Sequence, residues 1–368
     1  MIIAWLVLGF LALRFGVAAL NVLSNPRLGS HVNARKAGRV SILIPARNEA
    51  HNLPQLFAQL EQLSPTPFEI IVLNDHSEDE TEEILREKAM EWPLLSYLNG
   101  KELPEGWLGK NWACHQLAEV AEGDQFLFLD ADIAELKPEI LAHTSAWLSE
   151  KNLSLLSLFP DQIMHSQGEQ IVVPIMHHLL LSLLPLSWIY HLPFPSMAAA
   201  NGQFMLFDGT AYRQFRFHER VKHIIVEDIR IMQLVKSLNL KGMTLLGNGW
   251  IRCRMYGSWQ TGVEGFSKNL LSGFGNSIPG LLLYLFLTVF GWGWLIVYGV
   301  NWQLMTAFGL LAGIRIAISA LARQSIVRNL ILHPFQMASL LLIGFRSIYQ
   351  RLSGNSQWKG RNVHVSQS

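Results

Sequence analysis

The sequence predicts an α/β protein with a mostly parallel sheet, flanked by apolar transmembrane helices at both ends of the chain. Short apolar runs alternate with helical patterns between residues 40 and 160, which is typical of parallel strands joined by crossover helices. The two ends carry apolar stretches of the length that crosses a bilayer. Half of the 368 residues are hydrophobic and only 15% are charged, a composition too apolar for an ordinary soluble enzyme.

The bulk composition also excludes some classes of function. The net charge of +1 gives no electrostatic basis for binding nucleic acid. The two cysteines, Cys114 and Cys253, form neither a disulfide framework nor a zinc-type cluster. We therefore interpret both as reduced packing residues in a reducing compartment.

Residues 1–24 are predicted to form an uncleaved transmembrane anchor, apolar apart from Arg14. A cleaved signal peptide is the alternative, but it requires a basic amino end, which this segment lacks. Basic residues follow the anchor, and the positive-inside rule then places the next domain in the cytoplasm. These residues are Arg27, Arg35, Lys36 and Arg39.

Residues 40–275 are predicted to form the sheet domain. Strands are expected at 40–45, 68–73, 94–98, 125–129, 153–159 and 198–207. Helices are expected at 52–63, 111–121, 138–148 and 226–236, and a further helix opens at 78–83. Residues 171–195 are largely apolar but contain three prolines and three histidines, so we expect a segment lying in the membrane interface. We interpret its histidines as interfacial and not as metal ligands.

Residues 279–350 are predicted to form C-terminal transmembrane or interfacial helices, followed by a polar tail at 351–368. The stretches 279–300 and 302–321 are each long enough to cross a bilayer. A third crossing by 329–349 would leave the basic tail outside the cytoplasm, so a re-entrant or interfacial position is favoured.

Two carboxylates one residue apart, Asp130 and Asp132, follow the most apolar strand. Residues i and i+2 of an extended chain point the same way, so the two side chains can converge on one point. Such carboxylates repel each other unless a cation lies between them, and a hard divalent ion bridging to phosphate oxygens fits. A solvated turn is the alternative interpretation, because the tripeptide alone is a weak signal.

Polar clusters follow the other predicted strands as well. Any one of them could be a turn or a helix cap, but the carboxyl ends of parallel strands meet at one edge of a sheet, where ligands bind. Together with the Gly109-Lys110 element they predict a metal–diphosphate site. The clusters are Arg47-Asn48-Glu49, Asn74-Asp75, Asp130 with Asp132, and Glu227-Asp228.

The segments 41–49, 72–77, 129–132 and 226–228 resemble the motifs of family 2 glycosyltransferases of the GT-A fold. The resemblance covers about residues 40–241. Four further segments are similar to the membrane-anchored branch that glycosylates carotenoids, hopanoid-like lipids and related acceptors, although this narrower resemblance is less specific. They are 109–112, 201–204, 265–269 and 358–361.

The resemblance implies a role for each site residue. Asp130 would contact the ribose or sugar. Asp132, together with Asp130, would bind the Mg²⁺ or Mn²⁺ ion on the diphosphate. Asp228 would be the general base, with Glu227 supporting it, and Lys110 would lie near the diphosphate. The uridine would be held by Pro45, Ala46, Asn48, Glu49 and Asp75. Because Asp228 begins a helix, the helix dipole predicts a carboxylate that is ionised and only weakly basic.

The sequence departs from processive members of the family, which carry Gln-x-x-Arg-Trp after the base. Residues 259–268 lack this motif, which favours a single transfer. Lys268 either takes over part of the role of that arginine or is a solvated surface lysine.

The sequence therefore predicts a multi-pass protein of the cell membrane, with its catalytic domain in the cytoplasm. It would transfer one sugar, with inversion, from a UDP-sugar (UDP-glucose is preferred) to a lipid such as a carotenoid or terpenoid. A polyprenyl-phosphate glycosyltransferase and an inactive membrane scaffold are the alternatives. The sequence leaves the sugar, the acceptor and the oligomeric state open.

Overall fold

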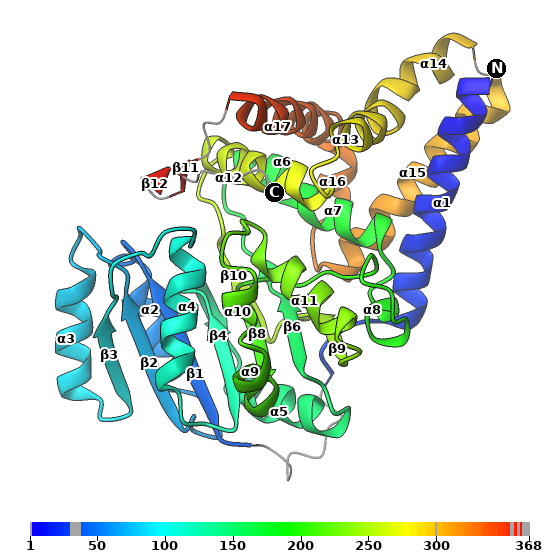
Figure 1. Cartoon of the computed structure of the whole chain (residues 1–368). Coiled ribbons are helices and arrows are strands. Elements are labelled where there is room, and N and C mark those ends of the chain that lie inside the picture. The colour runs from blue at the N-terminus through cyan, green and yellow to red at the C-terminus, as the bar shows by residue number, and fades with distance from the viewer. Residues whose placement is uncertain (1, 30–37, 299, 354–356, 359–360, 363–368) are drawn as a thin grey trace. The chain divides into compact units, whose positions relative to one another are not determined.

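The structure is a computed structural model that describes residues 2–29, 38–298, 300–353, 357–358 and 361–362 (Figure 1). The chain forms two compact units. The sheet unit comprises Pro26–Ile163 and Leu186–Arg254, and the helical unit comprises Met1–Asn25, Met164–Pro185 and Met255–Ser368. Arg35, Lys36 and Lys359, which entered the topology prediction, lie outside the described residues.

The sheet unit is built on a seven-stranded sheet in the order β3-β2-β1-β4-β8-β6-β9. All neighbouring pairs are parallel except those of β8, which runs antiparallel to β4 and β6. The strands are β1 (Val40–Ala46), β2 (Glu69–Asn74), β3 (Leu95–Asn99), β4 (Gln125–Leu129), β6 (Leu155–Phe159), β8 (Phe204–Asp208) and β9 (Gly242–Leu246). The predicted mostly parallel α/β fold is confirmed.

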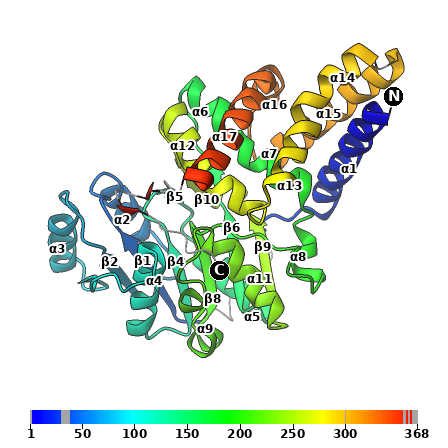
Figure 2. The same cartoon turned by 45° about the horizontal axis from the view of Figure 1, so that its top comes forward.

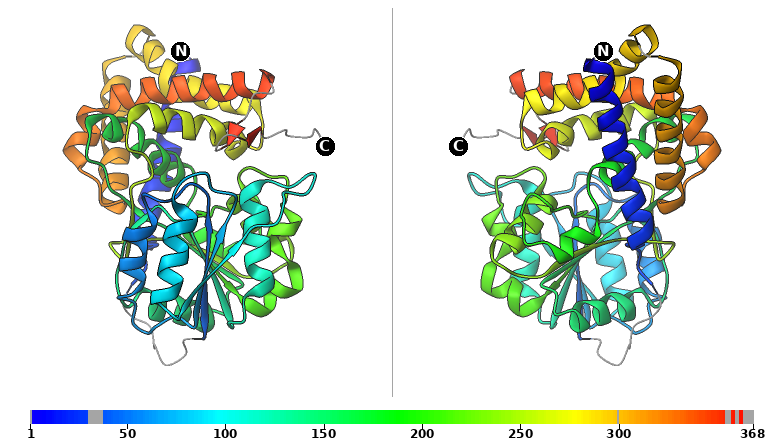
Figure 3. Two further views of the ribbon diagram at one scale, coloured as in Figure 1. Left: turned by 90° about the vertical axis from the view of Figure 1, so that its left-hand side faces the viewer. Right: turned by 90° about the vertical axis from the view of Figure 1, so that its right-hand side faces the viewer.

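Helices cover both faces of this sheet, as the edge-on views of Figure 3 show. Apolar side chains point to both faces, and every residue of β4 and β6 is buried, which explains the unbroken apolar runs in the sequence. The helices of the unit are α2 (Leu53–Leu60), α3 (Thr81–Glu91), α4 (Gly109–Val120), α5 (Ile140–Glu150), α8 (Ser187–His191), α9 (Gly209–Phe215), α10 (Phe217–Arg220) and α11 (Glu227–Ser237).

The strand expected at 198–207 begins only at Phe204. A turn precedes it, in which the Asn201 side chain accepts a hydrogen bond from the backbone N–H of Gln203 at 2.8 Å. The Asn201 carbonyl accepts another from the Phe204 amide at 3.3 Å. Asparagine competes with strand pairing in this way, so the apolar pattern overestimated the length of β8.

A small second sheet has the order β5-β10-β7. It consists of β5 (Ile133–Leu136), β7 (Asp161–Gln162) and β10 (Ile251–Cys253). Strand β10 pairs Cys253 with Ile133, the residue that follows Asp132. This pairing brings residue 253 to the end of β4.

The helical unit has its own apolar core, formed where α6, α7, α12, α13 and α17 pack together. Its elements are α1 (Ile2–Ser24), α6 (Gln167–Val172), α7 (Pro174–Leu183), α12 (Trp259–Gly273), α13 (Ile278–Leu285), a π-helical turn (Phe286–Phe290), α14 (Gly291–Tyr298), α15 (Asn301–Leu321), α16 (Ile326–Ile331), α17 (His333–Ser353), β11 (Gln357–Trp358) and β12 (Arg361–Asn362). Figure 2 shows α1 alongside α14 and α15.

Three helices in the described part of the chain are long and apolar enough to cross a membrane: Ile2–Ser24, Ile278–Tyr298 and Asn301–Leu321. They correspond to the predicted N-terminal anchor and to the first two C-terminal spans. Helix α17 carries much of the third stretch, 329–349, and is not among these three. An interfacial position for it remains a prediction.

The compact units divide the chain differently from the predicted domains. Residues 255–275 were assigned to the sheet domain but cluster with the helical unit. The predicted interfacial segment is split, because α6 and α7 belong to the helical unit and α8 to the sheet unit.

Candidate active site

A polar cluster lies where β4 ends and β8 begins. Asp130 follows the last residue of β4, and Gln203 precedes the first residue of β8. Because Leu129 and Phe204 are partners in the antiparallel pair, Asp130 and Gln203 face each other, and the Asp130 amide donates to the Gln203 carbonyl at 3.2 Å. The reversed direction of β8 therefore brings the 201–203 turn to the edge where the parallel strands end.

Gln203 holds the second carboxylate of the motif. Its Nε2 donates to Oδ1 and Oδ2 of Asp132 at 3.0 and 2.9 Å, and it lies 2.7 Å from the Cys253 sulfur. Burial, followed by the charges of Asp130 and Glu49, raises the pKa of Asp132 to about 6, against the hydrogen bond from Gln203. The Asp132 carboxylate is thus held in place but electrostatically unfavourable.

Lys110 lies between two carboxylates. Its Nζ is 2.9 Å from both Asp130 oxygens and 3.3 Å from Glu227 Oε1. Burial opposes the charge of this ammonium, but Asp130 and Glu227 outweigh it and raise the lysine pKa well above its usual value. Lys110 is therefore a permanent cation at this edge of the sheet.

Gly202 allows these groups to approach the backbone. A Cβ atom at this position would lie 3.0 Å from Lys110 Nζ and 3.3 Å from Glu227 Oε1. A side chain there would force the ends of Lys110 and Glu227 to shift by a few tenths of an ångström. The close approach, and not an unusual backbone angle, favours glycine at this position.

Asp228 is positioned by backbone amides at the start of α11. Its Oδ2 accepts from the Gly202 amide at 3.1 Å, and its Oδ1 accepts from the Ile229 amide at 2.7 Å. Burial and then the neighbouring Glu227 nevertheless raise its pKa to about 7. The expectation of a weakly basic carboxylate is wrong, because desolvation and Glu227 outweigh the helix dipole.

The predicted uridine residues lie at the ends of β1 and β2. Pro45 and Ala46 close β1, and the Asp75 amide donates to the Ala46 carbonyl at 2.8 Å. Asn48 has a left-handed backbone, with φ of 54°, and its Oδ1 accepts from the Glu78 amide at 2.8 Å. The structure thus places these residues at the same edge as Asp130, since β1 lies between β2 and β4.

Glu49 lies close enough to Asp132 to contribute to its raised pKa. Its Oε2 also accepts from Asn52 Nδ2 at 2.7 Å, at the start of α2. Lys268 lies on α12, which belongs to the helical unit and not to the sheet unit. Its predicted role remains a prediction.

Gln203 and Cys253 were not predicted as site residues. Gln203 belongs to the Asn-Gly-Gln-Phe segment, which was noticed only for its resemblance. Cys253 is free and buried, as expected, but its sulfur also lies 3.6 Å from Asp132 Oδ2. No sequence signal identifies this contact, because it depends on the pairing of β10 with β5.

No group of three or more His, Cys, Asp or Glu side chains that could hold a metal occurs among the described residues. The cluster therefore fits a hard divalent cation only if a diphosphate supplies part of the coordination. Asp130 and Asp132 provide carboxylate oxygens, and Gln203 Oε1 is buried without a hydrogen-bond partner in the described structure. Oxygen atoms are the ligands that Mg²⁺ and Mn²⁺ prefer.

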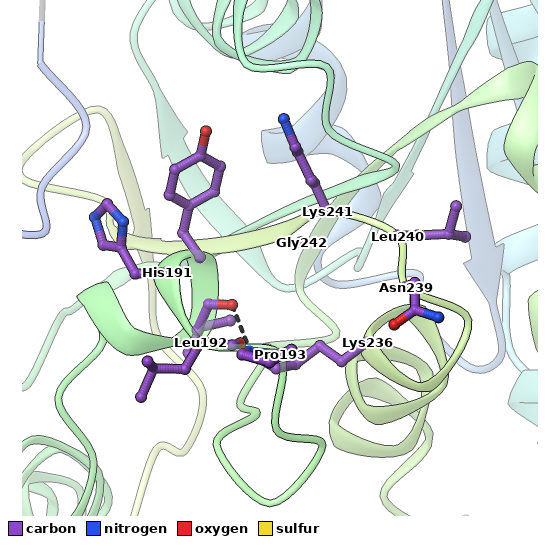
Figure 4. Close-up of a pocket in the computed structure, with 10 residues that line it drawn as sticks. His191, Leu192, Pro193, Lys236, Asn239, Leu240, Lys241 and Gly242 are labelled. Atoms are coloured by element: carbon purple, nitrogen blue, oxygen red, sulfur yellow. Dashed lines mark hydrogen bonds between the residues drawn. The ribbon is translucent and has the colours of Figure 1, made fainter.

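A separate cavity of about 190 Å³ lies in the sheet unit between α8 and the turn from α11 to β9 (Figure 4). None of the predicted site residues lines it. Lys236 Nζ donates to the carbonyls of Ile189 and Leu192 at 2.7 and 2.5 Å, which anchors α8 to α11. We interpret this cavity as part of the packing of α8.

Comparison with known proteins agrees with this architecture. Residues 41–157 match the family model for Glycosyl transferase family 2. A 4,4'-diaponeurosporenoate glycosyltransferase from Staphylococcus haemolyticus is 27% identical over 261 residues, and one from Staphylococcus aureus is 27% identical over 260 residues. Each match covers 68% of this chain and 66% of the relative, slightly under two thirds of its length.

A solved structure shares the fold. The mannosyltransferase from Pyrobaculum calidifontis, in complex with GDP-Man and Mn²⁺, superposes with a TM-score of 0.54 at 16% identity. The superposition covers 95% of this chain and 99% of that one. The expected GT-A fold is confirmed.

Replacing Asp132 with asparagine should stabilise the protein at pH 8 when EDTA removes divalent cations. The folded pKa of about 6 lies above the usual 3.8, so the ionised carboxylate costs stability as the pH rises. Its loss should raise the free energy of unfolding by about 1–3 kcal/mol, which denaturation in detergent micelles would measure.

Asp124→Asn is the matched control. Arg39 holds the pKa of this exposed carboxylate below its usual range, so its removal should not stabilise. Added Mg²⁺ or Mn²⁺ should stabilise the wild type but not Asp132→Asn. An Asp132→Asn protein that unfolds no later than the wild type at pH 8 in EDTA would contradict this account.

Proposed function

We propose that this chain, which carries a glycosyltransferase family 2 domain, is a membrane-bound inverting glycosyltransferase. It moves one sugar from a UDP-sugar, with UDP-glucose preferred, to a lipid acceptor. The observation that carries the proposal is the arrangement around Gly202, where Lys110, Asp130, Glu227 and Asp228 converge beside Asp132. A general base, a fixed cation and a pair of carboxylates for a metal are the groups that glycosyl transfer from a nucleotide requires.

The donor would lie along the carboxyl ends of β2, β1 and β4. Pro45, Ala46, Asn48, Glu49 and Asp75 are proposed to hold the uridine, and Asp130 the ribose or sugar. The Lys110 ammonium is fixed by carboxylates on two sides, and we propose that it lies close to the bound diphosphate. Its charge favours departure of the diphosphate.

Asp132, assisted by Asp130, is proposed to hold a Mg²⁺ or Mn²⁺ ion, and Gln203 Oε1 is available as a further oxygen. When bound, such an ion neutralises the charge that develops on the departing diphosphate. In the absence of the ion, Gln203 orients the Asp132 carboxylate through two hydrogen bonds. The Cys253 sulfur lies 2.7 Å from the same Nε2 atom of Gln203.

Asp228 is proposed as the general base. A pKa of about 7 suits it to accept a proton from an acceptor hydroxyl near neutral pH. As the acceptor oxygen bonds to the anomeric carbon, the bond to the diphosphate breaks and the hydroxyl proton passes to Asp228 Oδ1 or Oδ2. A single displacement of this kind inverts the configuration. Lys268, on α12, is proposed to assist the departing group.

The acceptor is proposed to be a membrane lipid, such as a carotenoid or terpenoid. The names of the curated relatives support this class of acceptor. The three helices long and apolar enough to cross a membrane support its delivery from the bilayer. The basic residues after α1 support a catalytic domain that faces the cytoplasm.

Two alternatives remain distinguishable. A polyprenyl-phosphate acceptor is already an anion and does not need a base for deprotonation. An inactive scaffold would need neither the raised pKa of Asp228 nor the fixed position of Lys110. Mass spectrometry of lipid extracts from cells with and without the enzyme would identify the glycosylated lipid directly.

Asp228→Asn should lower kcat by roughly 10²- to 10⁴-fold and leave the KM for the nucleotide sugar nearly unchanged. Asparagine keeps the acceptor oxygen for an amide hydrogen bond but cannot take up the proton. Steady-state kinetics with the purified enzyme and its lipid acceptor would measure both constants.

Glu227→Gln is the control and should have a milder effect on kcat, because Glu227 supports Lys110 and is not the base. A small loss in Asp228→Asn would point to an acceptor that is already ionised. Unchanged turnover together with an earlier thermal transition would show that Asp228 only caps α11.

The pH profile of kcat/KM should rise through about pH 7. Asp228 is active when deprotonated, so activity is present above its pKa and is lost as the pH falls below it. The acid limb should be absent from the residual activity of Asp228→Asn. A wild-type profile that is flat between pH 5.5 and pH 8.5 would be inconsistent with this base.

A cysteine introduced at Glu87 should report the orientation of the sheet unit. Glu87 is exposed on α3, whereas the native Cys114 and Cys253 are buried, so the parent protein is a low-background control. The introduced cysteine should resist membrane-impermeant thiol reagents in intact cells and react after lysis. Labelling in intact cells would place the catalytic domain on the opposite side.

A further inference from the structure

The helical unit contains a buried polar cluster that the proposed transfer reaction does not use. Arg14 and Arg315 are 1% and 2% exposed and lie well inside α1 and α15, two of the helices apolar enough to cross a membrane. On α1, Arg14 shares the buried face with Leu11 and Ala18. Ionisable residues at such depth are costly, and they usually mark a functional site.

Each arginine is held by neutral partners. Arg14 donates to Ser182 Oγ at 3.1 and 2.9 Å, and its Nη2 lies 2.7 Å from His178 Nε2. Arg315 Nε donates to His333 Nδ1 at 2.8 Å, and the His178 and His333 rings are 6.1 Å apart. The two arginines therefore belong to one cluster, to which α1, α7, α15 and α17 all contribute.

The cluster has more hydrogen-bond donors than acceptors. Guanidinium can only donate, so His178 accepts at Nε2 and must carry its proton on Nδ1. This Nδ1 is buried without a partner in the described structure, and so is the hydroxyl of Tyr284. The Tyr284 ring lies 5.7 Å from the Arg14 guanidinium carbon. Two further donors thus lack an acceptor beside the two cations.

The described residues of the helical unit supply no carboxylate to this cluster. Its three segments contain nine lysines and arginines but only two acids, Glu169 and Glu264. Glu169 accepts hydrogen bonds from the His165 amide and the Ser166 hydroxyl at the start of α6. Glu264 pairs with Arg346 at 3.6 Å. Arginine does not lose its proton in proteins, so the charges of Arg14 and Arg315 have no counter-ion among the described residues of the unit.

We propose that Arg14, Arg315, His178 and Tyr284 form a binding site for the oxyanion of a membrane amphiphile, a carboxylate or phosphate carried on an apolar chain. An oxyanion accepts several hydrogen bonds at once and neutralises both guanidinium groups. The aromatic ring of Phe10, 5.6 Å from the Arg14 guanidinium carbon, and the apolar faces of α1 and α15 suit the attached chain. The competing explanation is a polar clasp, meaning a set of hydrogen bonds that only holds the helices together and binds no ligand.

Thermal unfolding of the full-length chain in detergent micelles, with four matched additives, tests this site. Hexadecanoate and hexadecyl phosphate present the two oxyanions on one chain, hexadecanol presents the chain alone, and inorganic phosphate presents the anion alone. At least one of the two amphiphilic anions should raise the melting temperature, and the alcohol and the free anion should not. Stabilisation by inorganic phosphate to the same extent would overturn the assignment to an amphiphile.

Arg14→Gln and Arg315→Gln should abolish the shift, whereas Arg346→Gln, which removes an exposed arginine from the same unit, should preserve it. Tyr284→Phe breaks no hydrogen bond between helices, so it reports on the site even if the arginine variants do not fold. It should weaken the apparent affinity by about fivefold to tenfold. Equal shifts in the wild type and in Tyr284→Phe or the arginine variants would establish the clasp and overturn the binding site.

Discussion

Repulsion among closely grouped carboxylates is the constraint on which the sheet unit depends. Asp130, Asp132, Glu227 and Asp228 gather at one edge of the sheet, and a single ammonium, that of Lys110, lies between Asp130 and Glu227. Burial and mutual repulsion raise the pKa of Asp132 and of Asp228. This imbalance costs stability, and it is the physical basis on which we propose one carboxylate as a cation ligand and the other as a proton acceptor. Strain of this kind is expected at a site where chemistry takes place.

The antiparallel strand β8 makes this concentration of charge possible. Because β8 is antiparallel to its neighbours, it begins at the edge of the sheet where β4 ends. The 201–203 turn, which precedes β8, therefore lies among the carboxylates. The turn supplies a backbone amide to Asp228, a side-chain amide to Asp132 and, at Gly202, the space for Lys110. One short segment thus contacts both the proposed base and the proposed metal ligand.

The helical unit shows the opposite imbalance. Two buried guanidinium groups, those of Arg14 and Arg315, are held by serine and histidine, whereas the buried Glu169 and the exposed Glu264 are engaged elsewhere. Desolvation penalises both imbalances in the same way, and a ligand of the opposite charge would relieve each of them. The chain therefore carries one cluster dominated by carboxylates and one dominated by guanidinium groups, and each lies within its own unit.

The sequence alone determined the fold class, the apolar helices at both ends and most residues of the candidate site. Buried parallel strands leave unbroken apolar runs, and polar residues follow wherever such a strand ends, so Asp75, Asp130 and Asp132 could be read directly. Only the tertiary structure revealed the contacts of Gln203 and Cys253, the raised pKa of Asp228 and the partners of Arg14, because these depend on strand pairing, desolvation and helix packing between distant segments. Local sequence encodes periodicity and turns, whereas the electrostatic state of a buried group is set by neighbours that only folding brings together.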